Sequence, residues 1–206
     1  MMKNKGIGYI SRLALLIGLI IILTILPLGF IKIGPVEIVL VHIPVIVGAL
    51  VLGPASGLLL GTAFGIASLM LAPGNALMAP IWSVAPLSVV VICVVPRMLM
   101  GLLTGVFARL MGKAFKEKLT FVGDILVGVV GSGLNTALFL STLWLLGAKP
   151  LQEVLTANNM GALSALFATI ISVNGVTEAI TAAVLVPAIC QALRMYTKRQ
   201  RSTMVR

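Results

Sequence analysis

The stretch from His42 to Gly65 constrains the fold more than any other part of the chain. It contains two uncharged apolar runs that meet at Gly53-Pro54, with one imidazole at its start. The second run carries glycine at every fourth position, at Gly57, Gly61 and Gly65. Small residues let helix backbones approach closely in lipid, where van der Waals packing replaces the hydrophobic drive between helices. The stretch therefore predicts two membrane helices joined by a tight turn, the second with a glycine face suited to helix packing.

The composition identifies the solvent as lipid. Of 206 residues, 60% are hydrophobic and 10% are charged, whereas soluble domains carry about 25% charged residues. A membrane-spanning helix needs about 20 mostly apolar residues. The chain has room for about six such helices with short connections, so we predict one integral membrane domain over residues 1–206 and no separate soluble domain.

The basic residues show which side of the membrane the termini occupy. Three clusters contain Lys3, Lys5 and Arg12; Arg109, Lys113, Lys116 and Lys118; and Arg194, Lys198, Arg199, Arg201 and Arg206. Only Lys32, Arg97 and Lys149 fall in the alternate connections. Cytoplasmic loops carry excess Lys and Arg. The placement of the basic residues therefore predicts cytoplasmic N- and C-termini in a lipid bilayer. The net charge of +10 reflects this placement and does not indicate nucleic-acid binding.

The apolar runs define six expected helices. Their approximate ranges are Tyr9–Leu26, His42–Gly53, Pro54–Ala72, a fourth ending near Met111, Phe121–Leu146 and Gly161–Arg194. The fourth helix starts either at Leu87, with a kink at Pro96, or at Pro96. Proline suits a first helical turn, which favours Pro96. The sixth range exceeds a bilayer, so that helix must extend beyond the membrane or break once.

The connections on the outer side differ in character. Phe30 to Val41 is mixed in polarity and is either a short strand-like segment or an interfacial one. Pro73 to Pro96 carries four prolines together with Asn75 and Trp82. Such interrupted backbone is tolerated at membrane depth only inside protein or along a cavity, so this segment is either an interfacial loop or a lid over a pocket. Gly147 to Met160 is expected to form a further outer connection.

Several kinds of chemistry are excluded. The chain has no phosphate-binding G-x-x-x-x-G-K-[ST] loop, and its single histidine belongs to no His/Cys cluster with metal-ligand spacing. No nucleophile, base and orienting residue can be assembled. Cys93 and Cys190 lie in apolar runs and are expected to be reduced packing residues. We therefore predict no enzyme, catalytic residue, metal site or cofactor.

Polar residues inside the expected helices are the candidates for function, because such groups are costly in lipid and usually face a bundle interior or a cavity. Asn174, Thr177, Glu178 and Thr181 share one face of the sixth helix, and Ser132, Asn135 and Thr136 share one face of the fifth. Interhelical hydrogen bonding is the alternative, and we favour it for Ser132, Thr136 and Thr181. Glu178 is predicted to be functional, with Asn135 or Arg97 as its partner.

Four longer strings extend the pattern along most of the chain. They are HIPVIVGALVLGP from His42, PRMLMGLLTGVFARL from Pro96, GSGLNTALFL from Gly131 and NGVTEAITAAVLVPAI from Asn174. Together they resemble the substrate-binding S components of energy-coupling factor (ECF) vitamin transporters, most of all the pantothenate group. The resemblance implies a six-helix bundle in a bacterial cell membrane that binds a vitamin from outside. It also implies docking on a membrane coupling subunit driven by two cytoplasmic ATPases.

The resemblance also assigns roles to residues. The family's A-x-x-x-A docking motif in helix 1 is matched by Ala14, with Gly18 in place of the second alanine. Arg97 is suited to the carboxylate of pantothenate, and Asn135, Asn174 and Glu178 to its hydroxyls and amide. The remaining expected substrate-binding residues are His42, Asn75, Trp82 and Thr177. Another small vitamin or precursor (a pyrimidine or a folate-like compound), a structural membrane protein without a ligand, and an autonomous secondary transporter remain alternatives.

Overall fold

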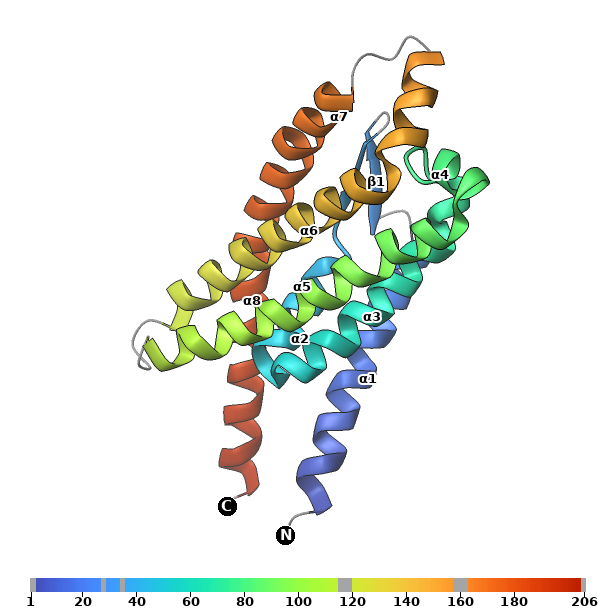
Figure 1. The fold of residues 1–206 in the computed structure, drawn as a ribbon. Helices are drawn as coiled ribbons and strands as arrows, with labels where there is room; N and C mark the ends of the chain where they lie inside the picture. The colour runs from blue at the N-terminus through green and yellow to red at the C-terminus, as the bar shows by residue number, and fades with distance from the viewer. Residues whose placement is uncertain (1–2, 27–28, 34–35, 115–119, 158–162, 205–206) are drawn as a thin grey trace.

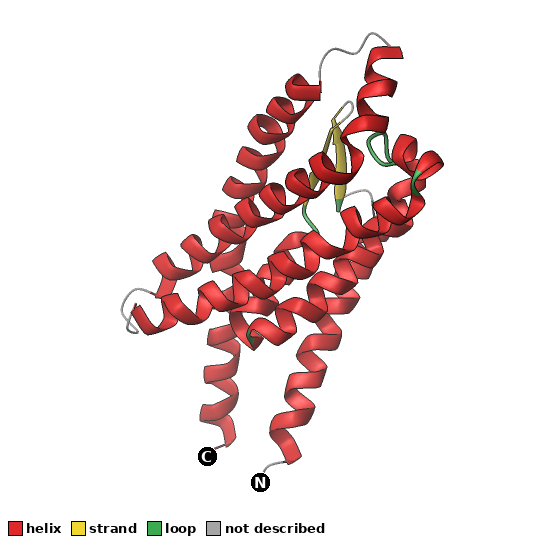
Figure 2. Ribbon diagram, viewed as in Figure 1, coloured by secondary structure: helices red, strands yellow, loops and turns green. Residues whose placement is uncertain are grey.

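The computed structural model describes residues 3–26, 29–33, 36–114, 120–157 and 163–204. Its elements are α1 (Lys3–Ile25), β1 (Phe30–Ile33), β2 (Val36–Val39), α2 (His42–Leu52), α3 (Pro54–Leu71), η1 (Ala72–Gly74), α4 (Ala79–Val84), α5 (Pro86–Ala114), α6 (Thr120–Ala157), α7 (Leu163–Thr169), the π-helical segment η3 (Ile170–Gly175) and α8 (Val176–Met204). Helices form nearly all of the structure, and one small hairpin is the exception (Figure 2). Both termini lie at one end, and the hairpin, α4 and α7 lie toward the other (Figure 1).

Five helical stretches of the described chain are long and apolar enough to cross a membrane. They are Gly8–Ile25, Pro54–Gly74, Pro86–Lys113, Phe121–Val154 and Leu163–Met195. The all-helical membrane class is therefore confirmed. The sixth expected span, α2, has 11 residues and is about 16 Å long, roughly half of a 30 Å hydrocarbon core. Helix α2 cannot cross the bilayer alone.

The glycines of α3 pack against α5 within the chain. A Cβ on Gly57 would collide with the carbonyl oxygen of Gly101, and one on Gly101 would collide with that of Gly57. A Cβ on Gly61 would meet the carbonyl oxygen of Arg97 in the same way. The prediction of a packing role for this glycine face is confirmed, and the contact also fixes the backbone of α5 at Arg97.

The expected start of the fourth helix at Pro96 is wrong. Helix α5 begins at Pro86 and passes through Pro96. Proline has no N–H, so it leaves the carbonyl of the residue four positions earlier without its helical donor. Here that carbonyl belongs to Ile92, and Nη1 of Arg97 donates to it at 2.7 Å. The arginine side chain supplies the missing bond, which lets the helix continue.

Two other expected boundaries also change. Helix α6 continues through Pro150 to Ala157, so most of the expected outer connection Gly147–Met160 is helical, and residues 158–160 lie outside the described chain. The expected break in the last helix is present as the π-helical segment η3. That helix is described from Leu163 and runs beyond Arg194 to Met204, while Gly161 lies outside the described residues.

The two uncertain outer segments acquire definite structures. Phe30 to Val41 contains an antiparallel hairpin in which Phe30 pairs with Val39 and Ile31 with Ile38, so the strand-like alternative is confirmed. Pro73 to Pro96 forms η1, α4 and the first turns of α5. Leu77, Met78 and Ile81 of this segment are buried in a second hydrophobic cluster with α5 and α6. The segment is therefore packed protein rather than a plain interfacial loop.

One ion pair joins α6 to α8 near the end that carries the termini. Arg194 donates from Nη1 and Nη2 to the two carboxylate oxygens of Asp124, at 2.6 and 2.8 Å. The Asp124 side chain is 5% exposed and that of Arg194 43%. Sequence reasoning treated Arg194 only as a topology signal and did not predict this pair.

We expect Asp124→Asn to lower the free energy of unfolding by about 1–3 kcal/mol. This is less than for a fully buried pair, because Arg194 is half exposed and water can solvate its released charge. The melting temperature of the purified protein should fall by roughly 2–12 °C. Lys113→Gln, at an exposed position near the same end, is the matched control and should melt like the wild type. Equal melting of Asp124→Asn and wild type would contradict a stabilising role.

Candidate functional site

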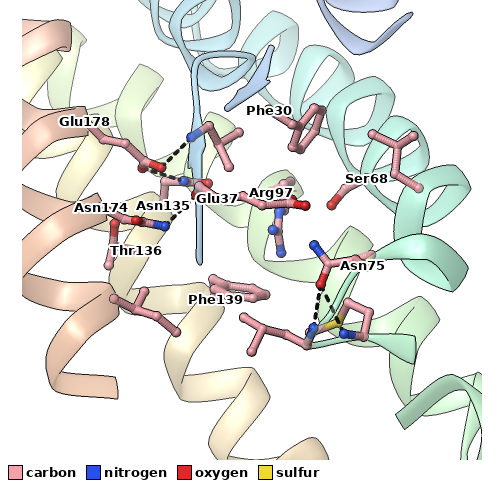
Figure 3. Close-up of a pocket in the computed structure, with 16 residues that line it drawn as sticks. Phe30, Glu37, Ser68, Asn75, Arg97, Asn135, Thr136, Phe139, Asn174 and Glu178 are labelled. Atoms are coloured by element: carbon pink, nitrogen blue, oxygen red, sulfur yellow. Dashed lines mark hydrogen bonds between the residues drawn. The ribbon is translucent and has the colours of Figure 1, made fainter. Parts of the chain in front are cut away.

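A cavity of about 70 Å³ lies beside the hairpin and is lined from β1, β2, α3, residues 75–78, α5, α6, η3 and α8. Of the eight predicted substrate-binding residues, the cavity brings together Asn75, Arg97, Asn135, Asn174 and Glu178 (Figure 3). Its volume is below the ~300 Å³ at the lower end of typical ligand pockets. The walls must therefore separate for a vitamin-sized ligand to enter.

Arg97 lines the cavity and is held there by several contacts. Its Cζ lies 4.5 Å from the ring centroid of Phe139 and 5.5 Å from that of Phe64, distances that allow cation–π attraction. The side chain is 5% exposed. One nitrogen donates to Ile92, while Nε has no partner among the described residues. The guanidinium is thus fixed in place and keeps donors for another group.

The side of the cavity formed by residues 75–78, α3 and α5 is rich in hydrogen-bond donors. The side-chain oxygen of Asn75 accepts from the backbone N–H of Leu77 and Met78, at 2.9 and 3.1 Å. These bonds orient the amide, so its NH₂ group remains to donate. Ser68 and Cys93 line the same side. Together with Arg97, these groups suit an anion.

The opposite side, formed by α6, η3 and α8, is rich in acceptors. Glu178 is 2% exposed; its Oε1 accepts from the backbone N–H of Val39 at 2.8 Å, and its Oε2 accepts from Asn135 at 3.4 Å. Asn174 donates through Nδ2 to the carbonyl of Glu37. The side-chain oxygens of Asn135 and Asn174 have no partner among the described residues. Of the two partners expected for Glu178, the hydrogen bond goes to Asn135.

Three predicted residues lie outside the cavity lining. His42 is fully buried at the start of α2, where Nδ1 lies 2.6 Å from the carbonyl oxygen of Val39. Trp82 is half-buried on α4 and packs in the second hydrophobic cluster. Thr177 is half-buried on α8, where its carbonyl accepts from the hydroxyl of Thr181.

Sequence reasoning missed several lining residues and misread others. Phe30, Glu37, Ser68 and Phe139 line the cavity without having been predicted. Thr136 lines it as well, although interhelical bonding was favoured for it. The Thr181 bond stays within its own helix, and the Ser132 hydroxyl has no partner within the described chain. A usable signal existed only for Glu37, the single carboxylate in the outer connection from Phe30 to Val41.

The small residues of α1 face away from the rest of the chain. Ala14 is exposed, and a Cβ built on Gly18 would have no atom within 4 Å. Only 6% of the Gly8–Ile25 span is buried, the smallest share among the five spans. Helix α1 therefore keeps a free face at these two residues within the described structure.

The fold and the site define a helical, multi-pass membrane protein in which buried polar side chains surround an internal cavity. Residues 9–190 match the model of the family described as "ECF transporter, substrate-specific component", and the chain belongs to that family. It is similar to the "Pantothenic acid transporter PanT" of Lactococcus lactis subsp. cremoris (strain MG1363), with 27% identity over 205 residues, covering 93% of this chain and 96% of that protein. The resemblance seen in the sequence is confirmed, and membership indicates a transport protein of the bacterial membrane rather than an enzyme.

Proposed function

We propose that the chain is the pantothenate-binding subunit of an ECF importer. It forms one membrane domain over residues 1–206, with six crossings and both termini cytoplasmic. The hairpin and α2 together make the second crossing, because α2 is too short to do so alone. Uptake requires docking on a transmembrane coupling subunit and two cytoplasmic ATPases. Family membership and the name of the relative support this assignment.

The observation that carries the vitamin assignment is the unequal chemistry of the two sides of the cavity. Pantothenate has a carboxylate at one end and hydroxyls beyond a central amide. The carboxylate fits the donor side, on Arg97 and Asn75, because the guanidinium fork matches carboxylate geometry. The hydroxyls fit the acceptor side, where Asn135 and Asn174 have unpartnered oxygens and Glu178 carries a carboxylate.

Titration calorimetry on the purified subunit tests this assignment. Pantothenate should bind tightly, whereas panthenol, in which a CH₂OH group replaces the carboxylate, should bind at least tenfold more weakly. Tight binding of a different vitamin would assign the same role to another substrate. If no vitamin binds and neither the coupling subunit nor the ATPases co-purify, the protein is a structural or assembly component.

Topology gives a separate prediction. Cysteines introduced at Lys149 and at Lys116 (the latter outside the described residues) should react from opposite sides of intact cells, because the basic clusters orient the chain. A membrane-impermeant maleimide should label only Lys149→Cys before the cells are opened. Cys93 and Cys190 are buried, so the background should be low. Labelling of both introduced cysteines from outside would contradict the proposed topology.

The free face of α1 predicts where the coupling subunit docks. We expect Ala14→Trp and Gly18→Trp to reduce vitamin uptake by cells at least tenfold, because a large side chain prevents close helix approach. Vitamin binding to the isolated subunit should not change, since neither residue lines the cavity. Leu145→Trp, at a 76% exposed position on α6, is the control. Equal loss of binding and uptake would mean that the α1 face packs within the subunit.

A further inference from the structure

Strand β2 has an outer edge that no other strand of the described residues covers. In an antiparallel strand the N–H and C=O of one residue point to the same side, and successive residues alternate. Leu40 donates to the carbonyl of Gly29, on the β1 side. By this alternation Ile38 also faces β1, while Glu37 and Val39 face away. Because the sheet has two strands in the part of the chain that the structure describes, the outward backbone groups need other partners.

The surroundings of β2 make those partners necessary. The strand ends at Val39, three residues before α2, and α2 is only about half the thickness of the hydrocarbon core. Ile38 and Val41 are buried. Backbone polar groups at membrane depth cost several kcal/mol each when they are unsatisfied. An uncovered strand edge is therefore not tolerated here.

Three side chains from other elements bond to this edge. The Val39 N–H donates to Glu178 of α8 at 2.8 Å. Asn174 of η3 donates to the Glu37 carbonyl. His42 of α2 lies 2.6 Å from the Val39 carbonyl oxygen, a bond that requires the hydrogen to be on Nδ1. In Figure 3 the dashed lines from Glu178 and Asn174 reach the strand at neighbouring points.

We propose that Glu178, Asn174 and His42 together take the place of a third strand and act as positioning residues for the hairpin. The hairpin in turn contributes Phe30, Glu37 and Val39 to the cavity wall. This role adds to the ligand contacts above, and it depends on the proposed function only for the choice of pantothenate as the probe. Asn174 uses Nδ2 for the strand, and its unpartnered oxygen remains available to a ligand. His42 does not line the cavity, so it acts on binding only through the hairpin.

Amide-resolved hydrogen exchange on the full-length, ligand-free protein tests the bond to Glu178. In the wild type, the Val39 amide should exchange within about tenfold of the Ile38 amide, which faces β1, because both are hydrogen-bonded. Glu178→Leu should speed exchange at Val39 at least tenfold, and Glu178→Gln, which retains an acceptor, should restore most of the protection. Exchange at Val39 in the wild type at the rate of an unstructured peptide overturns the proposal.

Variants of His42 test whether the hairpin position affects pantothenate binding. His42→Leu removes the donor to Val39 and should raise the pantothenate Kd about tenfold, since a buried carbonyl loses its partner. His42→Asn places an NH₂ group near the position of Nδ1 and should bring the Kd back toward the wild-type value. If His42→Leu does not fold, the exchange rates of the wild type still decide the question.

The two proposals fail in different ways. The exchange measurements need no ligand. If the wild type binds no pantothenate, the proposed function is contradicted, but the role of the three side chains is not affected. Wild-type Kd in His42→Leu, together with unchanged exchange over residues 36–41, would overturn that role and leave the vitamin assignment intact.

Discussion

Replacing Arg97 with glutamine should raise the Kd for pantothenate by roughly 30-fold or more, because truncating one partner of a buried charge pair costs about 2–5 kcal/mol. Arg97→Lys keeps the charge but loses the bidentate fork, so we expect a smaller loss of about tenfold. Both losses should appear in calorimetric titrations of the purified variants.

Panthenol separates the ligand contact from the structural role of Arg97. The Arg97 side chain also bonds to Ile92 and lies between two phenylalanine rings, so its removal could disturb the cavity generally. A general disturbance would weaken panthenol and pantothenate by the same factor. If Arg97 binds the carboxylate, panthenol should lose far less than pantothenate. Wild-type affinity for pantothenate in Arg97→Gln would remove Arg97 from the site.

Gly57→Val should be the most damaging substitution for folding. The new side chain would enter the space held by the Gly101 carbonyl, where backbone meets backbone and no flexible group can yield. Overpacking of this kind costs about 1–3 kcal/mol or more, which corresponds to a fall in melting temperature of roughly 6–12 °C at the upper figure. Thermal unfolding in detergent, followed by the loss of a monodisperse chromatographic peak, measures it.

Gly133→Val is the matched control, since a Cβ built on Gly133 in α6 would have no atom within 4 Å. At Gly133 the same change from glycine to valine should lower the melting temperature much less than at Gly57. A difference in helix propensity could then not explain the effect at Gly57. Gly61→Ala should lower the melting temperature by an intermediate amount, because its Cβ would push on the carbonyl of Arg97. Equal melting of Gly57→Val and Gly133→Val would show that the α3–α5 contact is loose.

The sequence was sufficient for features that repeat along a helix. Apolar length placed five of the six expected spans, and the spacing of Gly57, Gly61 and Gly65 predicted a packing face. The cost of polar groups in lipid selected Arg97, Asn135, Asn174 and Glu178. The cavity brings these four together because they occupy inward faces of three neighbouring helices. Their roles as ligand contacts remain predictions.

The sequence was insufficient where a side chain compensates for a backbone defect. From the sequence alone, Pro96 indicates a helix start. The helix continues through it because Arg97 donates to the Ile92 carbonyl. The position of the hairpin depends on Val39 meeting Glu178, 139 residues away in the chain. No local pattern encodes such a pairing, so His42 was predicted as a ligand contact although its bond is to the strand. Phe30 was missed for the same reason, whereas Glu37 was missed although it is the single carboxylate between Phe30 and Val41.

The bond between Arg97 and Ile92 limits how this site can change during evolution. As long as proline occupies position 96, a residue at 97 that cannot donate leaves the Ile92 carbonyl bare inside the protein. Loss of the arginine is therefore tolerated more easily after the proline at position 96 has been replaced by a residue with a backbone N–H. Among related chains we expect the two positions to covary, with Pro-Arg kept where the substrate is an acid and both residues replaced where it is uncharged.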